Sequence, residues 1–188
     1  SHFIQLHVLT SYPPANMNRD DTGRPKTALL GDALRLRTSS QSLKRAWRTS
    51  DVFAAAVASN LGTRTKRLGH EVCRNLLSGG VPEAKAREWA KQIAGQFGKL
   101  KSAPAGNEDA ALEIEQLAHL SPEEIASVRA LESVLVSRKS APEANELELL
   151  GHPANAVDIA MFGRMLADAP DYNVEAAVQA LVAVEHEA

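Results

Sequence analysis

The chain has 188 residues, a formal net charge of −2 and a hydrophobic content of 44%, which suits one domain, or one domain with an insertion, around a buried core. No apolar run approaches the about 18 residues of a membrane span. The first residues lack the basic start and cleavage site of a signal peptide. The single cysteine, Cys73, excludes an internal disulfide framework. We therefore expect a soluble cytoplasmic protein with no membrane partner.

Two strands are predicted near the N-terminus. Residues 3–10 alternate apolar and polar side chains over part of their length, which is typical of a half-buried strand. Residues 12–28 contain three prolines and read as a long loop. Residues 33–38 alternate leucine with arginine, which predicts a second strand with its leucines on one face and its arginines on the other.

A helical pattern follows these strands. Ser39 or Ser40 is suited to cap a helix that runs to about Ala58. The pattern remains helical to about residue 98, with stops at glycines. Residues 112–120 fit a strand or a helix equally well.

The C-terminal half has one strong local signal. The sequence SPEE has Ser121 as a helix cap, a proline at the first helical position and Glu124 reaching back, and it opens a helix predicted to end near Arg138. Residues 156–165 are mostly apolar and predict a strand, and a last helix is expected from about Asn173. This order predicts an α+β fold with a helical insertion.

The charge is unevenly distributed. Residues 19–48 hold eight basic and three acidic residues, whereas residues 140–188 hold nine acidic residues and one basic residue, Arg164. Such asymmetry indicates an anionic partner for the basic region. The alternative is that acidic and basic parts neutralise each other inside the fold.

The most basic stretch reads RTSSQSLKRAWR, at residues 37–48. On a helix, its polar side chains fall within an arc of about 100°. That arc contains Gln41, Lys44, Arg45 and Arg48. Leu43, Ala46 and Trp47 lie on the other side, which is predicted to pack. The serine-rich helix start adds hydroxyl and N–H donors for an anion. We expect phosphate contacts that ignore base sequence, although a solvated basic face is the alternative.

The chain resembles a known family in three stretches. FIQLHVLTSYPPANMNRDD, LRLRTSSQSLKRAWR and AVDIAMFGRM are similar to CasC, the backbone subunit of the type I-E CRISPR Cascade surveillance complex. The resemblance covers residues 2–50 and 152–178 most closely. It implies an RRM-like palm formed by residues 1–58 and 151–188, with helical fingers inserted at residues 59–150.

The resemblance also implies a function. Family members stack as a helical filament along the CRISPR guide RNA, hold its backbone and leave its bases free to pair with target DNA. The expected partners are therefore this RNA, the paired DNA, other copies of the chain and other Cascade subunits. No catalytic residue, metal or cofactor is expected. The implied RNA-binding residues are Arg19, Lys26, Ser39, Gln41, Lys44, Arg48, Arg164 and Met165, with Met165 packing on a base or sugar. Arg45 is added to this set because helix geometry places it on the same face as Lys44 and Arg48.

Other hypotheses remain open. Asp20 and Asp21 could hold Mg²⁺ for RNA cleavage, or they could simply shape their loop. The basic helix could dock on an acidic protein surface, which would make the chain an assembly module. His70 and Cys73 lack a second pair of ligands for zinc. In the fingers, three cations are weaker candidates for contact with target DNA: Arg64, Lys66 and Arg67.

Overall fold

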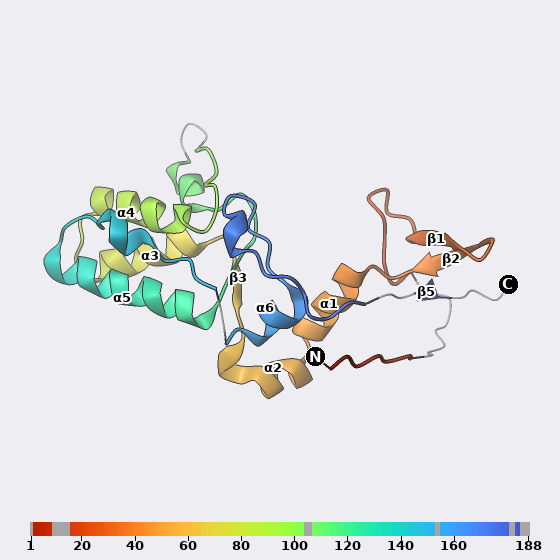
Figure 1. The fold of residues 1–188 in the computed structure, drawn as a ribbon. Helices are drawn as coiled ribbons and strands as arrows, with labels where there is room; N and C mark the ends of the chain where they lie inside the picture. Colours follow the sequence, from red (N-terminus) through yellow and green to blue (C-terminus); the bar gives the residue numbers. More distant parts are fainter. Residues whose placement is uncertain (1, 9–15, 104–106, 153–154, 181–182, 185–188) are drawn as a thin grey trace. The chain divides into compact units, whose positions relative to one another are not determined.

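The structure, a computed structural model, describes residues 2–8, 16–103, 107–152, 155–180 and 183–184. Its fold is α+β, as predicted. It divides into two compact units, which are described separately: unit 1 is residues 1–49 with 179–188, and unit 2 is residues 50–178 (Figure 1). The boundaries predicted for a palm and fingers remain predictions. No helix in the described part of the chain is long and apolar enough to cross a membrane.

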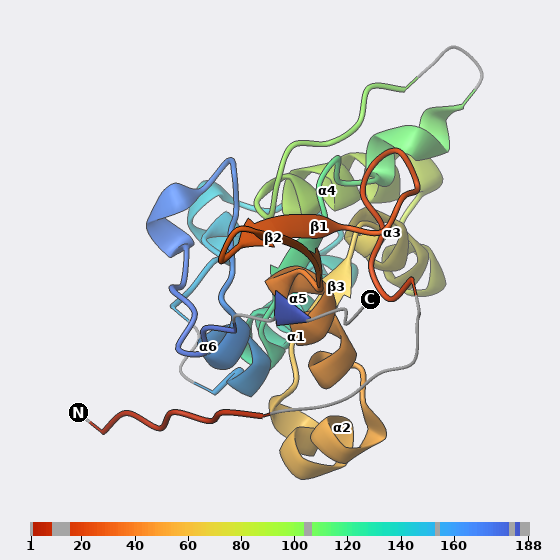
Figure 2. The same cartoon turned by 90° about the vertical axis from the view of Figure 1, so that its right-hand side faces the viewer.

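Unit 1 contains a small antiparallel sheet. Strands β1 (Thr27–Leu30) and β2 (Ala33–Arg37) form a hairpin, visible in Figure 2, and β2 also pairs with β5 (Ala183–Val184). Gly31 and Asp32 link β1 to β2 with φ values of 60° and 59°, as in the type I′ turn that matches the twist of a hairpin. The predicted second strand is thus confirmed.

Helix α1 (Ser40–Arg48) follows β2 directly. Ser39 caps it, because the Ser39 hydroxyl oxygen accepts a hydrogen bond from the Ser42 N–H at 3.2 Å. The predicted helix start is confirmed, but the predicted end near Ala58 is wrong. The reason is a second cap: the Ser50 hydroxyl accepts from the N–H of Phe53, which starts a new helix rather than continuing α1.

The strand predicted at residues 3–10 is wrong for the part that is described. Residues 2–8 form no strand, and Phe3, Ile4, Leu6 and Val8 are 79–96% exposed. Alternation of side chains specifies a face for burial, but a strand also needs a hydrogen-bonding neighbour. No described strand pairs with this segment. Residues 9–10 lie outside the described part of the chain.

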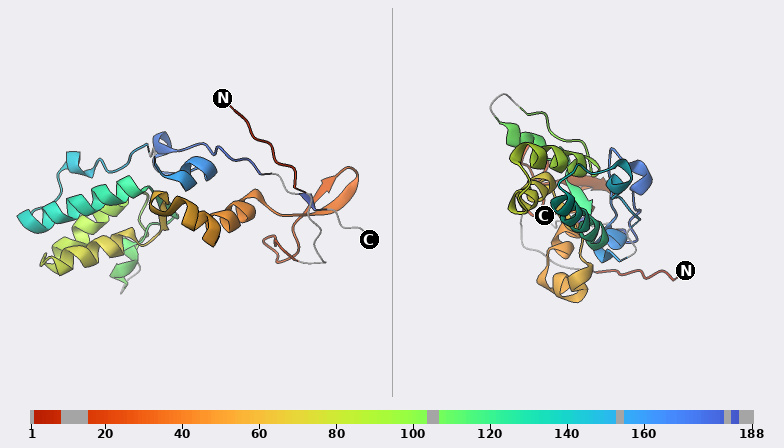
Figure 3. Two further views of the ribbon diagram at one scale, coloured as in Figure 1. Left: turned by 90° about the horizontal axis from the view of Figure 1, so that it is seen from below. Right: turned by 90° about the vertical axis from the view of Figure 1, so that its left-hand side faces the viewer.

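Unit 2 is built around three helices that lie side by side (Figure 3). They are α3 (Leu68–Ser78), α4 (Glu83–Gly95) and α5 (Pro122–Arg138). Their facing sides supply most of the buried core, which includes Leu76, Ile93 and Leu135. The capping box predicted for α5 is confirmed in full, with both reciprocal hydrogen bonds between Ser121 and Glu124.

Shorter elements complete unit 2. They are α2 (Asp51–Val57), β3 (Thr63–Thr65), β4 (Ala118–Leu120) and α6 (Val157–Phe162), with 3-10 helices at Ala58–Asn60, Glu108–Leu112, Ala144–Leu147 and Pro170–Tyr172. Strands β3 and β4 pair antiparallel, so the helical pattern predicted to residue 98 is interrupted by a strand. The ambiguous residues 112–120 end in β4.

Two predictions for the C-terminal part are wrong. The strand predicted at residues 156–165 is instead helix α6, since a short apolar run does not distinguish a buried strand from a buried helix. The helix predicted from Asn173 is absent from the described residues 173–180. The backbone of Val174 instead exchanges two hydrogen bonds with the backbone of Arg164, both at 2.9 Å. This antiparallel β-bridge requires an extended backbone at Val174, which is incompatible with a helix there.

Candidate nucleic-acid interface

In unit 1, the side chain of Asn18 fastens a loop to the strand–helix junction. Its amide oxygen accepts a hydrogen bond from the Ser39 backbone N–H at 2.8 Å, and its backbone carbonyl accepts from the N–H of Lys26 at 2.8 Å. The buried Ser39 hydroxyl already caps α1, so its observed role is structural. Asn18 therefore sets where the loop places its cations relative to α1.

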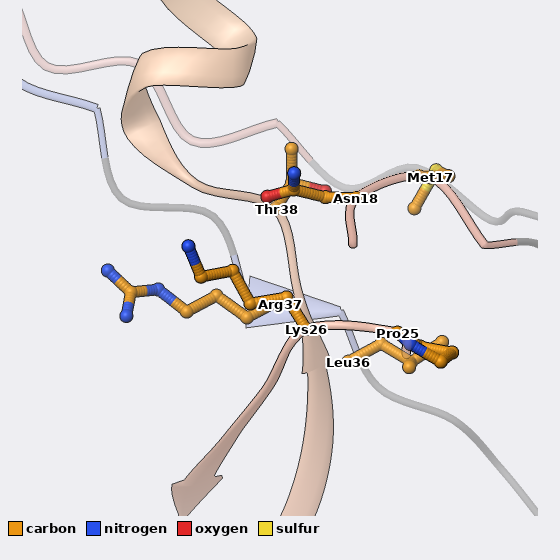
Figure 4. Close-up of a pocket in the computed structure, with 7 residues that line it drawn as sticks. All are labelled: Met17, Asn18, Pro25, Lys26, Leu36, Arg37 and Thr38. Carbon is orange, nitrogen blue, oxygen red and sulfur yellow. The ribbon is translucent and has the colours of Figure 1, made fainter. Parts of the chain in front are cut away.

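Lys26 and Arg37 face each other across the extended hairpin. The Arg37 N–H donates to the Lys26 carbonyl at 2.8 Å, one position beyond the Thr27–Leu36 pair. Directly opposed residues carry their side chains on the same face. Figure 4 shows both cationic side chains extending to the same side of a small notch, while Pro25 and Leu36 lie on the other side. Arg37 is not in the implied RNA-binding set, and the signal that could have added it is the ALRLR alternation.

The predicted binding face of α1 is open to solvent to different degrees. Gln41 and Arg45 are exposed, whereas Lys44 and Arg48 are partly buried. The predicted packing face is not buried: no residue of α1 is buried, and Trp47 is 39% exposed. The reason is that the buried hydrophobic residues of the described chain all lie in unit 2, so unit 1 has no core of its own for this face.

The cations of unit 1 differ from those of unit 2 in their pairing. Six of them form no ion pair with a carboxylate among the described residues of unit 1: Arg19, Arg24, Lys26, Arg37, Lys44 and Arg45. In unit 2, by contrast, cations commonly pair with acids, as in Arg87–Asp109, Lys99–Glu115, Lys101–Glu113, Arg129–Glu71, Arg138–Glu146 and Arg164–Glu124. Mutual neutralisation of acids and bases thus describes much of unit 2 but not these six unit 1 cations.

Asp20 shapes its loop. One carboxylate oxygen accepts hydrogen bonds from the Thr22 hydroxyl, the Thr22 N–H and the Arg24 N–H, at 2.8–2.9 Å. The Thr22 hydroxyl and the Arg24 N–H hold the pKa of this carboxyl group below its usual value. The backbone of Asp20 also pairs with that of Arg24 at 2.8 Å. These contacts match the loop-shaping hypothesis for Asp20.

Arg164 is placed differently from the expectation. Its side chain is buried in unit 2, where it donates to both Glu124 carboxylate oxygens at 2.8 and 2.9 Å and to the carbonyls of Gly151 and Tyr172. In this arrangement the guanidinium is not presented to a phosphate. Met165, the next residue, is 77% exposed. The structure therefore separates the two neighbours into an interior residue and a surface residue.

The remaining candidate groups in unit 2 are spread over several elements. Lys66 donates to the Glu115 carbonyl at 2.8 Å, and Arg64 and Arg67 are exposed, so their contact with target DNA remains a prediction. Cys73 is buried, which raises the pKa of its thiol. The residues described contain no group of three His, Cys, Asp or Glu side chains suited to a metal ion.

Comparison with known proteins gives the family. The family model described as "CT1975-like protein" matches residues 4–185, nearly the whole chain. The chain belongs to the CT1975-like protein family. A search of curated proteins found no match.

Solved structures of similar fold come from CRISPR complexes. One chain from a structure titled "CRISPR RNA-guided surveillance complex" is 30% identical, with a TM-score of 0.66, over 89% of this chain and 54% of that chain. Another, from "CRISPR RNA-guided surveillance complex, pre-nicking", is 30% identical with a TM-score of 0.64, over 87% of this chain and 47% of that chain. This CT1975-like chain thus spans about half the length of the solved chains that it matches.

Proposed function

We propose that this CT1975-like protein is a non-catalytic subunit of a type I-E Cascade surveillance complex that holds the guide RNA by its backbone, as CasC does. In this proposal unit 1 belongs to an RRM-like palm, and the helices of unit 2 form the fingers. The family match and the similarity to chains of CRISPR RNA-guided surveillance complexes support the proposal. The expected partners are guide RNA, paired target DNA, other copies of the chain and other Cascade subunits.

The observation that carries the proposal is the set of six unit 1 cations without a carboxylate partner in that unit. Like charges placed opposite each other on a sheet destabilise it unless an anion lies between them. Lys26 and Arg37 form such a pair. A polyanion would neutralise them, and the release of its counterions would favour binding.

The residue types suit a phosphate backbone rather than particular bases. Lys26, Lys44 and Arg45 offer charge, and Gln41 offers an amide, whereas the nine residues of α1 include one aromatic side chain, Trp47. Sequence-specific recognition of single-stranded RNA relies on stacking and on contacts to base edges. A subunit that must hold any guide would avoid contacts to base edges. Met165, for which the resemblance to CasC implies a position against the RNA, could still contact a base or sugar face, because such contact does not depend on sequence.

Two alternative functions are distinguished by simple assays. A ribonuclease using Asp20 and Asp21 would cleave labelled RNA in the presence of Mg²⁺ and lose this activity in Asp21→Ala. Our proposal predicts that the RNA stays intact with the unmodified protein and with Asp21→Ala. The engagement of Asp20 by Thr22 and Arg24 favours this result. An assembly module that docks only on acidic protein would leave free RNA unbound.

The test of the proposed function is a fluorescence-anisotropy titration of the protein with two single-stranded RNAs of equal length and unrelated sequence. We expect equal dissociation constants for the two. Strong preference for one RNA, or no binding of either at low salt, would contradict the proposal.

A further inference from the structure

Met165 is an exposed apolar side chain between two buried neighbours. It is 77% exposed, whereas Arg164 and Leu166 are 4% and 5% exposed. A lone exposed methionine is ordinary on a protein surface. The arrangement of the residues on either side of it is what distinguishes this one.

The Arg164 side of Met165 is fixed by a buried network. Besides its two contacts with Glu124, the Arg164 guanidinium donates to the Tyr172 and Gly151 carbonyls at 2.8–3.2 Å. Glu124 in turn accepts from the N–H groups of Ser121 at 2.8 Å and Gly151 at 3.0 Å. Glu124, the acidic residue of the α5 capping box, therefore also holds the segment that precedes Met165.

The Leu166 side is fixed by Asn173. The Leu166 N–H donates to the Asn173 side-chain oxygen at 2.6 Å. Next to this contact, the backbones of Arg164 and Val174 exchange two hydrogen bonds at 2.9 Å. The backbone at Met165 is thus held on both sides by contacts that the Met165 side chain does not make itself.

Helix α6 and Gly163 lead directly into Arg164 and Met165, and both are held in place by contacts within unit 2. The buried Asp158 carboxylate accepts from the Gly62 N–H at 2.8 Å and lies 2.7 Å from the Nε2 of His119, which ties the first turn of α6 to the β3–β4 region. Gly163 then turns the chain with φ +82°. A Cβ at this position would lie 3.0 Å from the Val174 carbonyl oxygen, which is a tight contact in addition to the strained φ.

We propose that Asn173 is a positioning residue that holds Met165 out of unit 2 as a pre-ordered apolar contact for single-stranded nucleic acid. This inference rests on the proposed function. A contact that is ordered before binding loses less conformational entropy on binding. The polarizable thioether can lie on the face of any base or sugar, and such contact tolerates every sequence.

A double-mutant cycle on RNA affinity tests the proposal, using Met165→Ala, Asn173→Ala and the double variant. We expect a loss of about threefold to tenfold for Met165→Ala, on the order of a weak base contact. Asn173→Ala should lose a similar factor, and the double variant should bind no worse than Met165→Ala, because the two residues act through one contact. The salt dependence should be unchanged in all three, since no phosphate contact is removed.

A purely structural role for Asn173 gives a different pattern. Asn173→Ala would then lower the melting temperature without weakening RNA binding, or would weaken it by a factor that multiplies with that of Met165→Ala. Asn145→Ala, the same change at an exposed site on another part of unit 2, is the matched control and should bind as the unmodified protein does. Faster hydrogen exchange of the Leu166 amide would verify that Asn173→Ala removes the intended contact.

The outcomes also separate this inference from the proposed function. If the unmodified protein binds RNA with a salt dependence but Met165→Ala binds equally well, the positioning proposal fails and the cation surface stands. If the unmodified protein does not bind RNA, both fail.

Discussion

Lys26 and Arg37 are direct cross-strand neighbours, joined by a 2.8 Å hydrogen bond from the Arg37 N–H to the Lys26 carbonyl. Neither side chain forms an ion pair with a carboxylate among the described residues of unit 1. The two positive charges lie on one face of the hairpin extension, and Asn18 ties the loop on one side of it to the start of α1. This relationship gives the first prediction.

Replacing both cations should change the salt dependence of RNA binding. For Lys26→Ala with Arg37→Ala, we expect the slope of log affinity against log salt to flatten by about 1.4, the value for two phosphate contacts to a single strand. Stability should be unchanged or rise slightly, because two like charges no longer oppose each other. The measurement is anisotropy at several salt concentrations.

A charge-matched control is available in unit 2. Lys85→Ala with Lys91→Ala also removes two exposed lysines, from α4. This variant should keep the slope of the unmodified protein. An equal flattening in both double variants would mean that overall charge, rather than the Lys26–Arg37 pair, sets the salt dependence.

Removal of the Glu124 carboxylate should destabilise unit 2. Glu124→Ala leaves the buried Arg164 guanidinium without its counter-charge and also removes the capping box of α5. Losing one partner of a buried ion pair typically costs about 3–5 kcal/mol. Urea denaturation should show this loss in the free energy of unfolding. If Glu124→Ala unfolds with a free energy within about 1 kcal/mol of the unmodified protein, as for a solvent-exposed pair, then the Arg164–Glu124 pair is not buried from solvent as the structure indicates.

Gly163→Ala tests the turn that precedes Met165. The backbone there has φ +82° and ψ 161°, a region that only glycine adopts readily, at a cost of about 1–3 kcal/mol for other residues. We expect a loss of stability in that range in chemical denaturation. Gly95→Ala, where an added Cβ has nothing within 4 Å, is the control and should be neutral or slightly stabilising.

Glu132 should make stability depend on pH. Its burial raises the pKa of the carboxyl group, although hydrogen bonds from Asn75 and Arg129 oppose this. The folded state then keeps the proton at a pH where the unfolded state has lost it, so stability falls as pH rises above the unfolded pKa of about 4.3. Relative to Glu132→Gln, the unmodified protein should become less stable between pH 4 and pH 7, measured by urea denaturation.

The sign of this effect can be checked with a second carboxylate. The pKa of Glu123 is lowered, chiefly by its own backbone N–H, so it contributes stability that is present above the unfolded pKa and lost as pH falls. Relative to Glu123→Gln, the unmodified protein should become more stable over the same rise in pH. The same direction for both variants would contradict the assignment.

Local signals in the sequence predicted the elements whose determinants are themselves local. Ser39 before SQSLKR and the SPEE box each contain the cap and the residues it bonds, and both helices begin as predicted. The alternation of leucine and arginine at residues 33–37 likewise predicted β2.

Elements set by distant contacts could not be predicted in this way. The apolar residues of α6 were consistent with a strand, and the bond from the Gly62 N–H to Asp158, 96 residues away, is not visible in local periodicity. The interior role of Arg164 depends on Glu124, 40 residues earlier. For the candidate site, the sequence identified the basic stretch, but which cations lack partners in unit 1 required the structure.

The most direct test of the central claim is the salt dependence of the unmodified protein's affinity for a single-stranded RNA of arbitrary sequence. The account predicts a steep linear fall of log affinity with log salt, with a slope of about −0.7 per contacted phosphate. Affinity that does not change with salt, or no detectable binding at low salt, would contradict it.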